Sequence, residues 1–304
     1  MAEMRLPARA VGAETRRVSD ADCAESAASA PPPLAAEQVE AFVRDGFVLL
    51  ERAFPREVAD ECRAFLWSET GCDPADPATW TRPVIRLPGY GGELFDRAAR
   101  TPRLHGAFDQ LVGPGRWLPR EGLGTFPIRF PHSDPPGDDG WHIDGSFTPP
   151  GEQGFWVDRR SRGRALLMLF LFSDIGVDDA PTRIKAGSHL DVARFLEAAG
   201  KAGKAAGGGA GDGGAELFAL CRELDAAGLL DSPDRRTVLA TGRAGDVYLC
   251  HPFLIHAAQP HRGSTARFIA QPPLMPADPA GPIRLDHPEG ELSPLERAVG
   301  IALG

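Results

Sequence analysis

Two spacings of apolar residues divide the chain into an amino-terminal helical part and a longer β-rich part. Up to residue 112, apolar positions recur every three or four residues, as on a helix that buries one face. Helices are expected over 34–46, in a segment that begins at Pro55, and near 102–112, with a short strand at 47–50. Gly46 suits the C-terminal cap of the first helix. The positions expected to be buried on these helices are Val39, Phe42, Val43, Val58, Cys62, Phe65, Leu66, Leu104, Phe108, Leu111 and Val112.

After about residue 114 the pattern changes to short apolar runs that are separated by glycine and proline. This spacing is typical of a β-sandwich or barrel, and it differs from the alternation of long helices with strands. The expected strand runs are 123–130, 140–147, 165–173, 181–185, 236–241, 246–256 and 266–271.

One segment, about 190–235, interrupts the strands. It contains two expected helices, 191–199 and 215–229, on either side of a tract in which eight of the fifteen residues from Gly200 to Gly214 are glycine. Such a tract is too flexible to order itself. The segment is either a surface insertion or a mobile lid over a site, and the sequence leaves both interpretations open.

Composition narrows the class of protein. Residues 1–33 are rich in alanine, serine and proline and are expected to be a flexible leader, with 34–304 forming a single domain. The net charge of −9 argues against a nucleic-acid partner. No apolar stretch is long enough to span a membrane, and the five cysteines are scattered as free thiols would be. We therefore expect a cytoplasmic monomer or homodimer.

The sequence contains three His-x-Asp pairs, which are candidate metal ligands. Alternate residues of a strand place both side chains on one face, within reach of one metal ion. The pair at His132 lies among prolines in a loop, and the pair at His189 opens an expected helix. The third pair, His142 and Asp144, lies in Trp-His-Ile-Asp-Gly, which alternates as a half-buried strand does. It is the strongest candidate for a metal site.

A third ligand is expected from the segment 245–261, where an apolar strand ends in His251, His256 and His261. Two histidines and one carboxylate form the facial set of non-haem Fe(II) oxygenases. Taken singly, each of these histidines is better explained as a core or turn residue.

Arg267 stands in an otherwise apolar strand, with Phe268 and Ala270 expected on the opposite face. An inward guanidinium needs an anionic partner, and the carboxylate of a bound ligand would supply one. The alternative is an outward, solvated arginine.

Together these segments resemble the phytanoyl-CoA dioxygenase family of Fe(II)/2-oxoglutarate oxygenases. The resemblance runs from about residue 36 to 275 and rests on the order of its pieces: Asp-Gly-Phe-Val-Leu-Leu at 45–50, Trp-His-Ile-Asp-Gly at 141–145, Leu-Phe-Ser-Asp at 171–174, Ala-Gly-Ser-His at 186–189, and His-Pro-Phe-Leu-Ile-His at 251–256.

The resemblance implies a mainly β fold with flanking helices: a double-stranded β-helix, or cupin-like jelly-roll, with N-terminal helices and a helical, glycine-rich insertion. It assigns His142, Asp144 and His256 to Fe(II), with His256 rather than His251 as the distal ligand. It also assigns Arg267, eleven residues beyond that ligand, to the far carboxylate of 2-oxoglutarate. Leu169 stands where the family often has an aromatic residue that lines the cosubstrate pocket. Asp179-Ala-Pro departs from the Asn-Gly frequently found before the Gly-Ser-His turn.

The implied activity is O2-dependent hydroxylation of an unactivated C–H bond, with release of succinate and CO2. Desaturation, cyclisation and epoxidation remain alternatives, since they need only a different placement of the substrate. Because Asp144 is present, halogenation is disfavoured. The expected substrate is a small molecule, either a specialised metabolite or an amino-acid-like compound. Candidate substrate-pocket residues are Arg129, His132, Trp141, Phe147, Trp156 and His251.

Two other classes remain. The chain could be a binding module of the same fold that lacks catalysis, or a metal enzyme that does not use 2-oxoglutarate. The complete set of His142, Asp144, His256 and Arg267 speaks against both.

Overall fold

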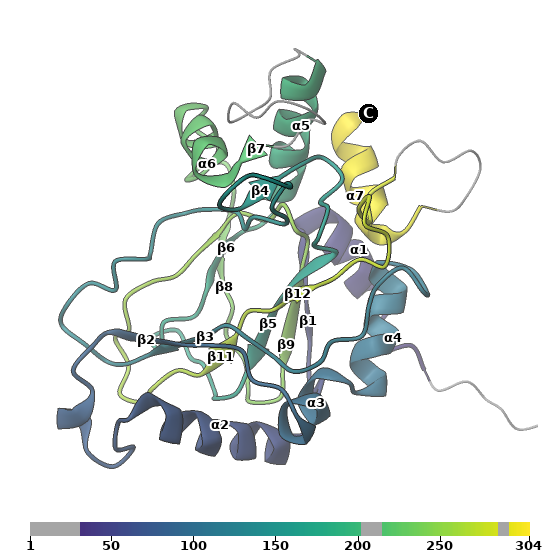
Figure 1. The fold of residues 1–304 in the computed structure, drawn as a ribbon. Helices are drawn as coiled ribbons and strands as arrows, with labels where there is room; N and C mark the ends of the chain where they lie inside the picture. The colour runs from purple at the N-terminus through teal and green to yellow at the C-terminus, as the bar shows by residue number, and fades with distance from the viewer. Residues whose placement is uncertain (1–30, 202–214, 285–291) are drawn as a thin grey trace, which may run out of the picture. The chain divides into compact units, whose positions relative to one another are not determined.

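The computed structural model describes residues 31–201, 215–284 and 292–304 and combines helices with antiparallel sheets (Figure 1). The helices are α1 (Ala36–Asp45), α2 (Arg56–Thr70), the 3-10 turn η1 (Pro77–Thr79), α3 (Glu93–Ala99), α4 (Pro102–Leu111), α5 (Ser188–Lys201), α6 (Leu217–Ala226) and α7 (Pro294–Leu303). The strands are β1 (Phe47–Leu50), β2 (Val84–Leu87), β3 (Phe126–Arg129), β4 (Trp156–Val157), β5 (Leu166–Leu171), β6 (Arg183–Lys185), β7 (Ala215–Glu216), β8 (Thr237–Leu239), β9 (Val247–Cys250), β10 (His256–Ala257), β11 (Ile269–Ala270) and β12 (Pro273–Leu274).

The larger sheet has the strand order β1-β9-β5-β11, and β12 also pairs with β5. All of these pairs are antiparallel, with Leu169 of β5 opposite Tyr248 of β9. The ribbon of β2 and β3 continues the sheet, because Arg129 at the end of β3 forms a bridge to Arg267, just before β11. The sheet thus joins segments from both ends of the described chain.

A second antiparallel sheet has the order β10-β6-β8. His142 extends it by a bridge to His256, the first residue of β10. Side chains from both sheets form one apolar cluster, in which Leu169 and Ile269 of the larger sheet meet Ile184 of the smaller. The two sheets therefore face each other across a common interior.

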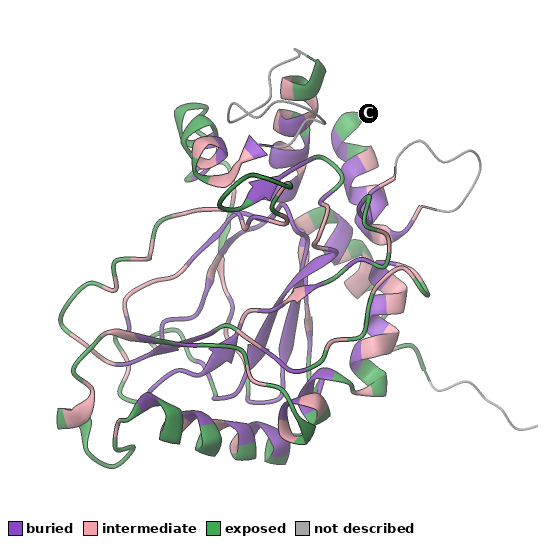
Figure 2. Cartoon of the chain, viewed as in Figure 1, coloured by how far each residue is buried: buried purple, intermediate pink, exposed green. Residues whose placement is uncertain are grey.

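Strand β5 is buried along its whole length, as the colouring of Figure 2 shows. Leu167, Leu169 and Leu171 face the interior between the sheets, while Met168 and Phe170 belong to the main hydrophobic core on the other side. Helix α2 contributes to that core, and its Trp67 ring lies 4.9 Å from the ring of Phe268. A continuous apolar run is the pattern expected of a strand that is covered on both faces.

Most of the elements expected from the sequence are confirmed. Gly46 ends α1 with a positive φ of 82°, and an added Cβ there would lie 2.4 Å from His189 Nδ1, so both conformation and space favour glycine. Helix α2 buries Val58, Cys62 and Leu66 as expected, but Phe65 is 37% exposed and packs edge-on against Tyr90 instead.

The structure also corrects and extends the sequence interpretation. The strand expected at 140–147 does not form: within it, only His142 and Phe147 make isolated bridges. Helices α3 and α7 were not predicted. Helices α5 and α6 are found at the expected insertion, whereas most of the glycine tract between them, and the leader up to residue 30, lie outside the described residues. Within the described part of the chain, no helix has the length and apolar character needed to cross a membrane.

Candidate metal centre

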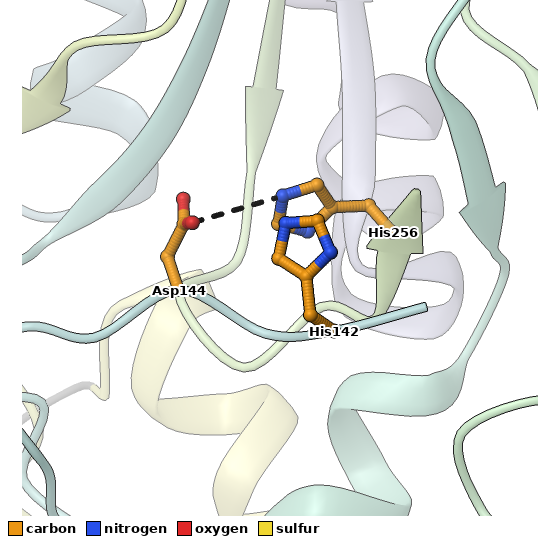
Figure 3. A group of neighbouring side chains, drawn as sticks. All are labelled: His142, Asp144 and His256. Carbon is orange, nitrogen blue, oxygen red and sulfur yellow. Dashed lines mark ion pairs between the residues drawn. The ribbon is translucent and has the colours of Figure 1, made fainter. Parts of the chain in front are cut away.

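His142, Asp144 and His256 converge on one point (Figure 3). One candidate ligand atom from each of the three side chains lies within 4.8 Å of the other two. Asp144 Oδ1 is 3.9 Å from His256 Nε2. These spacings are those of donors grouped around a single cation, since Fe, Zn and related metals bind nitrogen and oxygen at about 2.0–2.2 Å. Among the described residues, no other group of His, Cys, Asp and Glu side chains has this arrangement.

The backbone brings the two histidines together. The His142 amide donates to the His256 carbonyl at 3.0 Å, and the His256 amide donates to the His142 carbonyl at 2.9 Å. Asp144 follows two residues after His142 along the extended segment, while Ile143 between them is fully buried in the main core. Alternation along the segment therefore directs the histidine and the carboxylate to one side and the isoleucine to the other.

Backbone carbonyls fix the orientation of both imidazoles. The Nδ1–H of His142 donates to Gly140 O at 2.8 Å, and that of His256 donates to Leu254 O at 3.0 Å. A proton on Nδ1 leaves the Nε2 lone pair free, which is the usual arrangement of a metal-binding histidine. The donor set and its tautomers therefore fit a divalent metal such as Fe(II).

The ionisation states also fit a metal. Burial lowers the pKa of His256 to about 4, and the neighbouring His142 adds to this effect, so the ring is neutral near pH 7. Burial alone would raise the pKa of Asp144, but the charge of Arg164, followed by the electrostatic effect of His256 and His142, outweighs burial and holds the pKa below its usual value. Neutral imidazole and ionised carboxylate are the forms that bind metal.

Arg164 is a site residue that the sequence analysis missed. Its guanidinium donates to Asp144 Oδ2 at 3.0 Å and to the Gly145 carbonyl at 2.9 Å, and its side chain is 11% exposed. Asp144 therefore presents Oδ1 toward His256 and Oδ2 toward Arg164. The only available signal was an arginine directly before the apolar run of β5, and that position alone does not indicate which carboxylate it meets.

Arg267 points into the interior between the sheets, opposite to Phe268 and Ala270, as expected. It is 2% exposed, and it donates to the carbonyls of Ala180 at 2.5 Å and Pro127 at 3.1 Å. Its Nε has no partner in the described structure. Burial, and then the charge of Arg129, lowers its pKa well below the ordinary value. The inward interpretation of Arg267 is confirmed, and its own hydrogen-bond partners carry no negative charge.

The candidate pocket residues are dispersed. Arg129 is buried and pairs with Asp138 at 2.6 Å, while His132 accepts a hydrogen bond from the Asp134 amide in its loop. The Trp141 ring contacts two cations, from Arg183 and Lys185, each at 4.7 Å. Phe147 pairs with Trp156, which is buried. His251 is fully buried, and its ring lies 4.9 Å from that of His189.

Asp144 borders a cavity, and none of these six side chains lines it. Its wall comes mainly from loops around Tyr90, Arg120 and Phe155, which the sequence analysis did not single out. Loop residues far apart in the sequence carry no periodicity that would have revealed their meeting.

The family model for phytanoyl-CoA dioxygenase matches residues 93–269, more than half of the chain. The chain belongs to the phytanoyl-CoA dioxygenase family. All three residues of the metal-competent group lie inside the match. As a member of this family, the protein is an oxygenase of the Fe(II)- and 2-oxoglutarate-dependent class.

Solved structures are similar to this chain at low sequence identity, and one of them, JW0805, shares its fold. The hypothetical protein JW0805 from Escherichia coli is 15% identical, with a TM-score of 0.52 over 80% of this chain and 68% of that one. HygX from Streptomyces hygroscopicus, solved with nickel, 2-oxoglutarate and hygromycin B, is 20% identical, with a TM-score of 0.48 over 78% of this chain and 86% of that one. The non-haem α-ketoglutarate-dependent carbocyclase SnoK from nogalamycin biosynthesis is 18% identical, with a TM-score of 0.48 over 81% and 85%. No curated protein matches the sequence.

Proposed function

We propose that this protein hydroxylates an unactivated C–H bond of a small molecule, a specialised metabolite or an amino-acid-like compound, and that its two facing sheets form a double-stranded β-helix. One observation carries the proposal: His142, Asp144 and His256 meet with both Nε2 atoms free, inside the segment that matches the family. In this arrangement the three side chains hold Fe(II) on one face and leave other coordination positions open.

Each side chain has a distinct role. Asp144 would hold the metal, while Arg164 donates to Oδ2 and so keeps the carboxylate in one orientation. The carbonyls of Gly140 and Leu254 hold the imidazoles in the binding tautomer. When bound, iron with 2-oxoglutarate and O2 supplies the oxidant that an unactivated C–H bond requires.

Arg267 is proposed to bind the far carboxylate of 2-oxoglutarate. Three observations favour a bound anion beside Arg267: its Nε is unpaired, its side chain is almost completely buried, and Arg129 provides a second cation. Asp138 is the carboxylate that meets Arg129. Leu169 belongs to the apolar cluster between the two sheets and is proposed to border the carbon chain of the cosubstrate. The apolar side chains of this cluster keep water out of the interior, which strengthens the attraction between the guanidinium and the carboxylate.

The test is an anaerobic titration of the full chain with Fe(II) and then 2-oxoglutarate, followed by admission of O2. A weak visible charge-transfer band is expected on titration, and succinate release on oxygenation. His256→Ala should abolish both. As a matched control, His105→Asn alters a histidine that packs on Trp117 and lies outside the metal-competent group, and should retain both.

The absence of a band in the wild-type protein, or an unchanged band in His256→Ala, would contradict the site assignment. Succinate release screened across candidate small molecules identifies those that stimulate turnover. Mass analysis of the product then separates hydroxylation, which adds one oxygen atom, from desaturation or cyclisation, which removes two hydrogens.

A further inference from the structure

A cavity of about 680 Å³ adjoins the proposed iron site, with Asp144 and Gly145 in its wall. This volume lies within the range of small-molecule sites, roughly 300–1,000 Å³. The cavity is lined by Gly89, Tyr90, Gly91, Arg120, Glu121, Leu123, Gly124, Thr125, Asp144, Gly145, Phe155, Arg164, Leu217, Gln271 and Pro273. Because a proposed metal ligand lies in its wall, a molecule bound here would be close to the reacting centre.

Two arginines, Arg120 and Arg164, line this cavity. Arg120 donates to the backbone carbonyls of Pro273 at 2.5 Å and Gly122 at 3.4 Å, and no described residue forms an ion pair with it. Arg164 donates to Asp144 and Gly145, and its Nε has no hydrogen-bond partner in the described structure. Burial, and then the charge of Arg164, lowers the pKa of Arg120.

The two carboxylates in the cavity wall do not balance these charges. Asp144 already faces Arg164 and the proposed metal. The side chain of Glu121 is 92% exposed and forms an ion pair with Arg100 at 3.9 Å. Arg120 is thus a partly buried cation, in a pocket, without an anion of its own. Like charges placed together without a counter-charge are unfavourable, and a bound anion relieves that cost.

Part of the remaining wall is apolar, while Thr125 and Gln271 add polar side chains. Phe155 is 62% exposed although it packs directly on Gly145, where an added Cβ would lie 2.3 Å from the Phe155 Cβ. Tyr90, Leu123 and Leu217 add further apolar surface. A large aromatic ring that is left exposed beside a pocket marks a surface that a ligand can cover.

We propose that this cavity binds the organic substrate, and that the substrate is a small molecule with an apolar body and an oxyanion, either a carboxylate or a phosphate, which Arg120 and Arg164 hold. The inference rests on the proposed function, because it places the substrate beside the iron ligand Asp144. It adds a charge requirement to a substrate class that was otherwise open.

The test uses three probes that differ in their head group: 3-phenylpropionate, phenyl phosphate and the neutral 3-phenylpropionamide. Each is titrated by calorimetry into the full chain loaded with Ni(II) and saturating 2-oxoglutarate, so that the cosubstrate site is already filled. At least one anion should bind saturably, and the amide about tenfold more weakly or not at all. Whichever anion binds more tightly identifies the head group.

Arg120→Gln should weaken binding of that anion about tenfold to a hundredfold, and Arg120→Lys, which keeps the charge but loses the planar fork, should weaken it less. The matched control is Arg103→Gln, an exposed arginine on α4 that also donates to a backbone carbonyl, that of Glu51, and it should bind like wild type. Thermal unfolding of each variant establishes that it is folded.

Four results would each overturn the inference. The first two are equal binding of the amide and both anions, and no anion binding at all. The other two are displacement of the probe by further 2-oxoglutarate, and wild-type affinity in Arg120→Gln. Its failure is separable from that of the proposed function. A protein that binds Ni(II) and 2-oxoglutarate but no anionic probe refutes only the inference. A protein that binds neither Ni(II) nor 2-oxoglutarate refutes the proposed function, and its metal-free chain can still be titrated with the probes.

Discussion

Arg129 of β3 and Arg267, just before β11, lie opposite each other in an isolated bridge: the Arg129 amide donates to the Arg267 carbonyl at 3.0 Å, and the Arg267 amide donates to the Arg129 carbonyl at 2.8 Å. Both residues are 2% exposed. Asp138 meets Arg129 at 2.6 Å and also pairs with the more exposed Arg86. The carboxylate is thus shared by two arginines, while Arg267 makes hydrogen bonds only to carbonyls. Two buried cations beside one carboxylate leave an excess of positive charge, which a bound dicarboxylate would offset.

Arg267→Gln is accordingly expected to raise the KM for 2-oxoglutarate about tenfold to a hundredfold, because a charge-assisted, two-pronged hydrogen bond is lost. Arg267→Lys should show a smaller increase. Steady-state succinate formation at varied 2-oxoglutarate measures the effect. A KM equal to that of wild type in Arg267→Gln would remove Arg267 from the cosubstrate site.

Divalent metal should stabilise the folded protein, because the three ligands are assembled only in the native state. At about one hundred times its dissociation constant, Ni(II) should contribute about 3 kcal/mol and raise the melting temperature by about 5 °C or more. Scanning fluorimetry with Ni(II) and with EDTA measures the difference. Asp144→Ala should show the same melting temperature in both, and a Ni(II)-dependent increase in that variant would argue for a different site.

Stability should fall in mild acid because of a histidine outside the metal centre. Burial lowers the pKa of His189 to about 4 in the folded chain, against about 6.5 for an exposed histidine. The unfolded chain therefore binds an extra proton between these values. Above pH 6.5 the His189 ring is neutral in both the folded and the unfolded chain, so its burial carries no protonation penalty. As the pH falls from 6.5 toward 4, about 3 kcal/mol of stability is lost.

Urea unfolding at several pH values across this window measures the loss. His189→Gln can still donate to the Val43 carbonyl, which His189 Nε2 contacts at 3.1 Å, but it cannot take up a proton. Its stability should depend less steeply on pH than that of wild type. Parallel profiles for the two proteins would assign the acid sensitivity elsewhere, for example to the neighbouring His251, whose pKa burial also lowers.

Glu296 should anchor the carboxyl-terminal helix α7. Its side chain is 1% exposed, it accepts hydrogen bonds from Arg116 at 2.7 and 2.8 Å, and it closes the N-terminal cap of the helix with Ser293. Glu296→Gln removes the charge and leaves Arg116 without its carboxylate, at an expected cost of about 2 kcal/mol in the free energy of unfolding. Glu40→Gln is the matched control, since Glu40 pairs with Arg297 on the surface and should contribute little. Equal effects of the two substitutions in urea unfolding would contradict this role.

The parts of the fold that the sequence predicted are those that local patterns determine. The stripe of Val58, Cys62 and Leu66 follows the helical period, and the inward direction of Arg267 follows from its alternation with Phe268. Phe65 fits the same helical stripe, yet it meets Tyr90 at the protein surface because the neighbouring loop decides its surroundings. Periodicity shows which face a residue occupies, but it does not show what covers that face.

The candidate site divides in the same way. His142 and Asp144 were identifiable because two residues of one segment carry their own spacing, and His256 because the resemblance to a family places it. Arg164 and Arg120 were not identifiable from the sequence, since each reaches the site from a loop. Only the tertiary structure decides which carboxylate, carbonyl or cavity a loop arginine meets. The strand expected around His142 is replaced by isolated bridges at His142 and Phe147, yet the alternation that aims the two proposed ligands remains.

The reciprocal hydrogen bonds between His142 and His256 bear on when iron can be acquired. The two histidines come from distant parts of the chain, so a growing polypeptide that still lacks the later strand offers a metal ion only one histidine and one carboxylate. That pair is too few ligands to hold a labile ferrous ion firmly. With the ligands proposed above, iron should therefore load only after synthesis has passed His256 and the second sheet has paired.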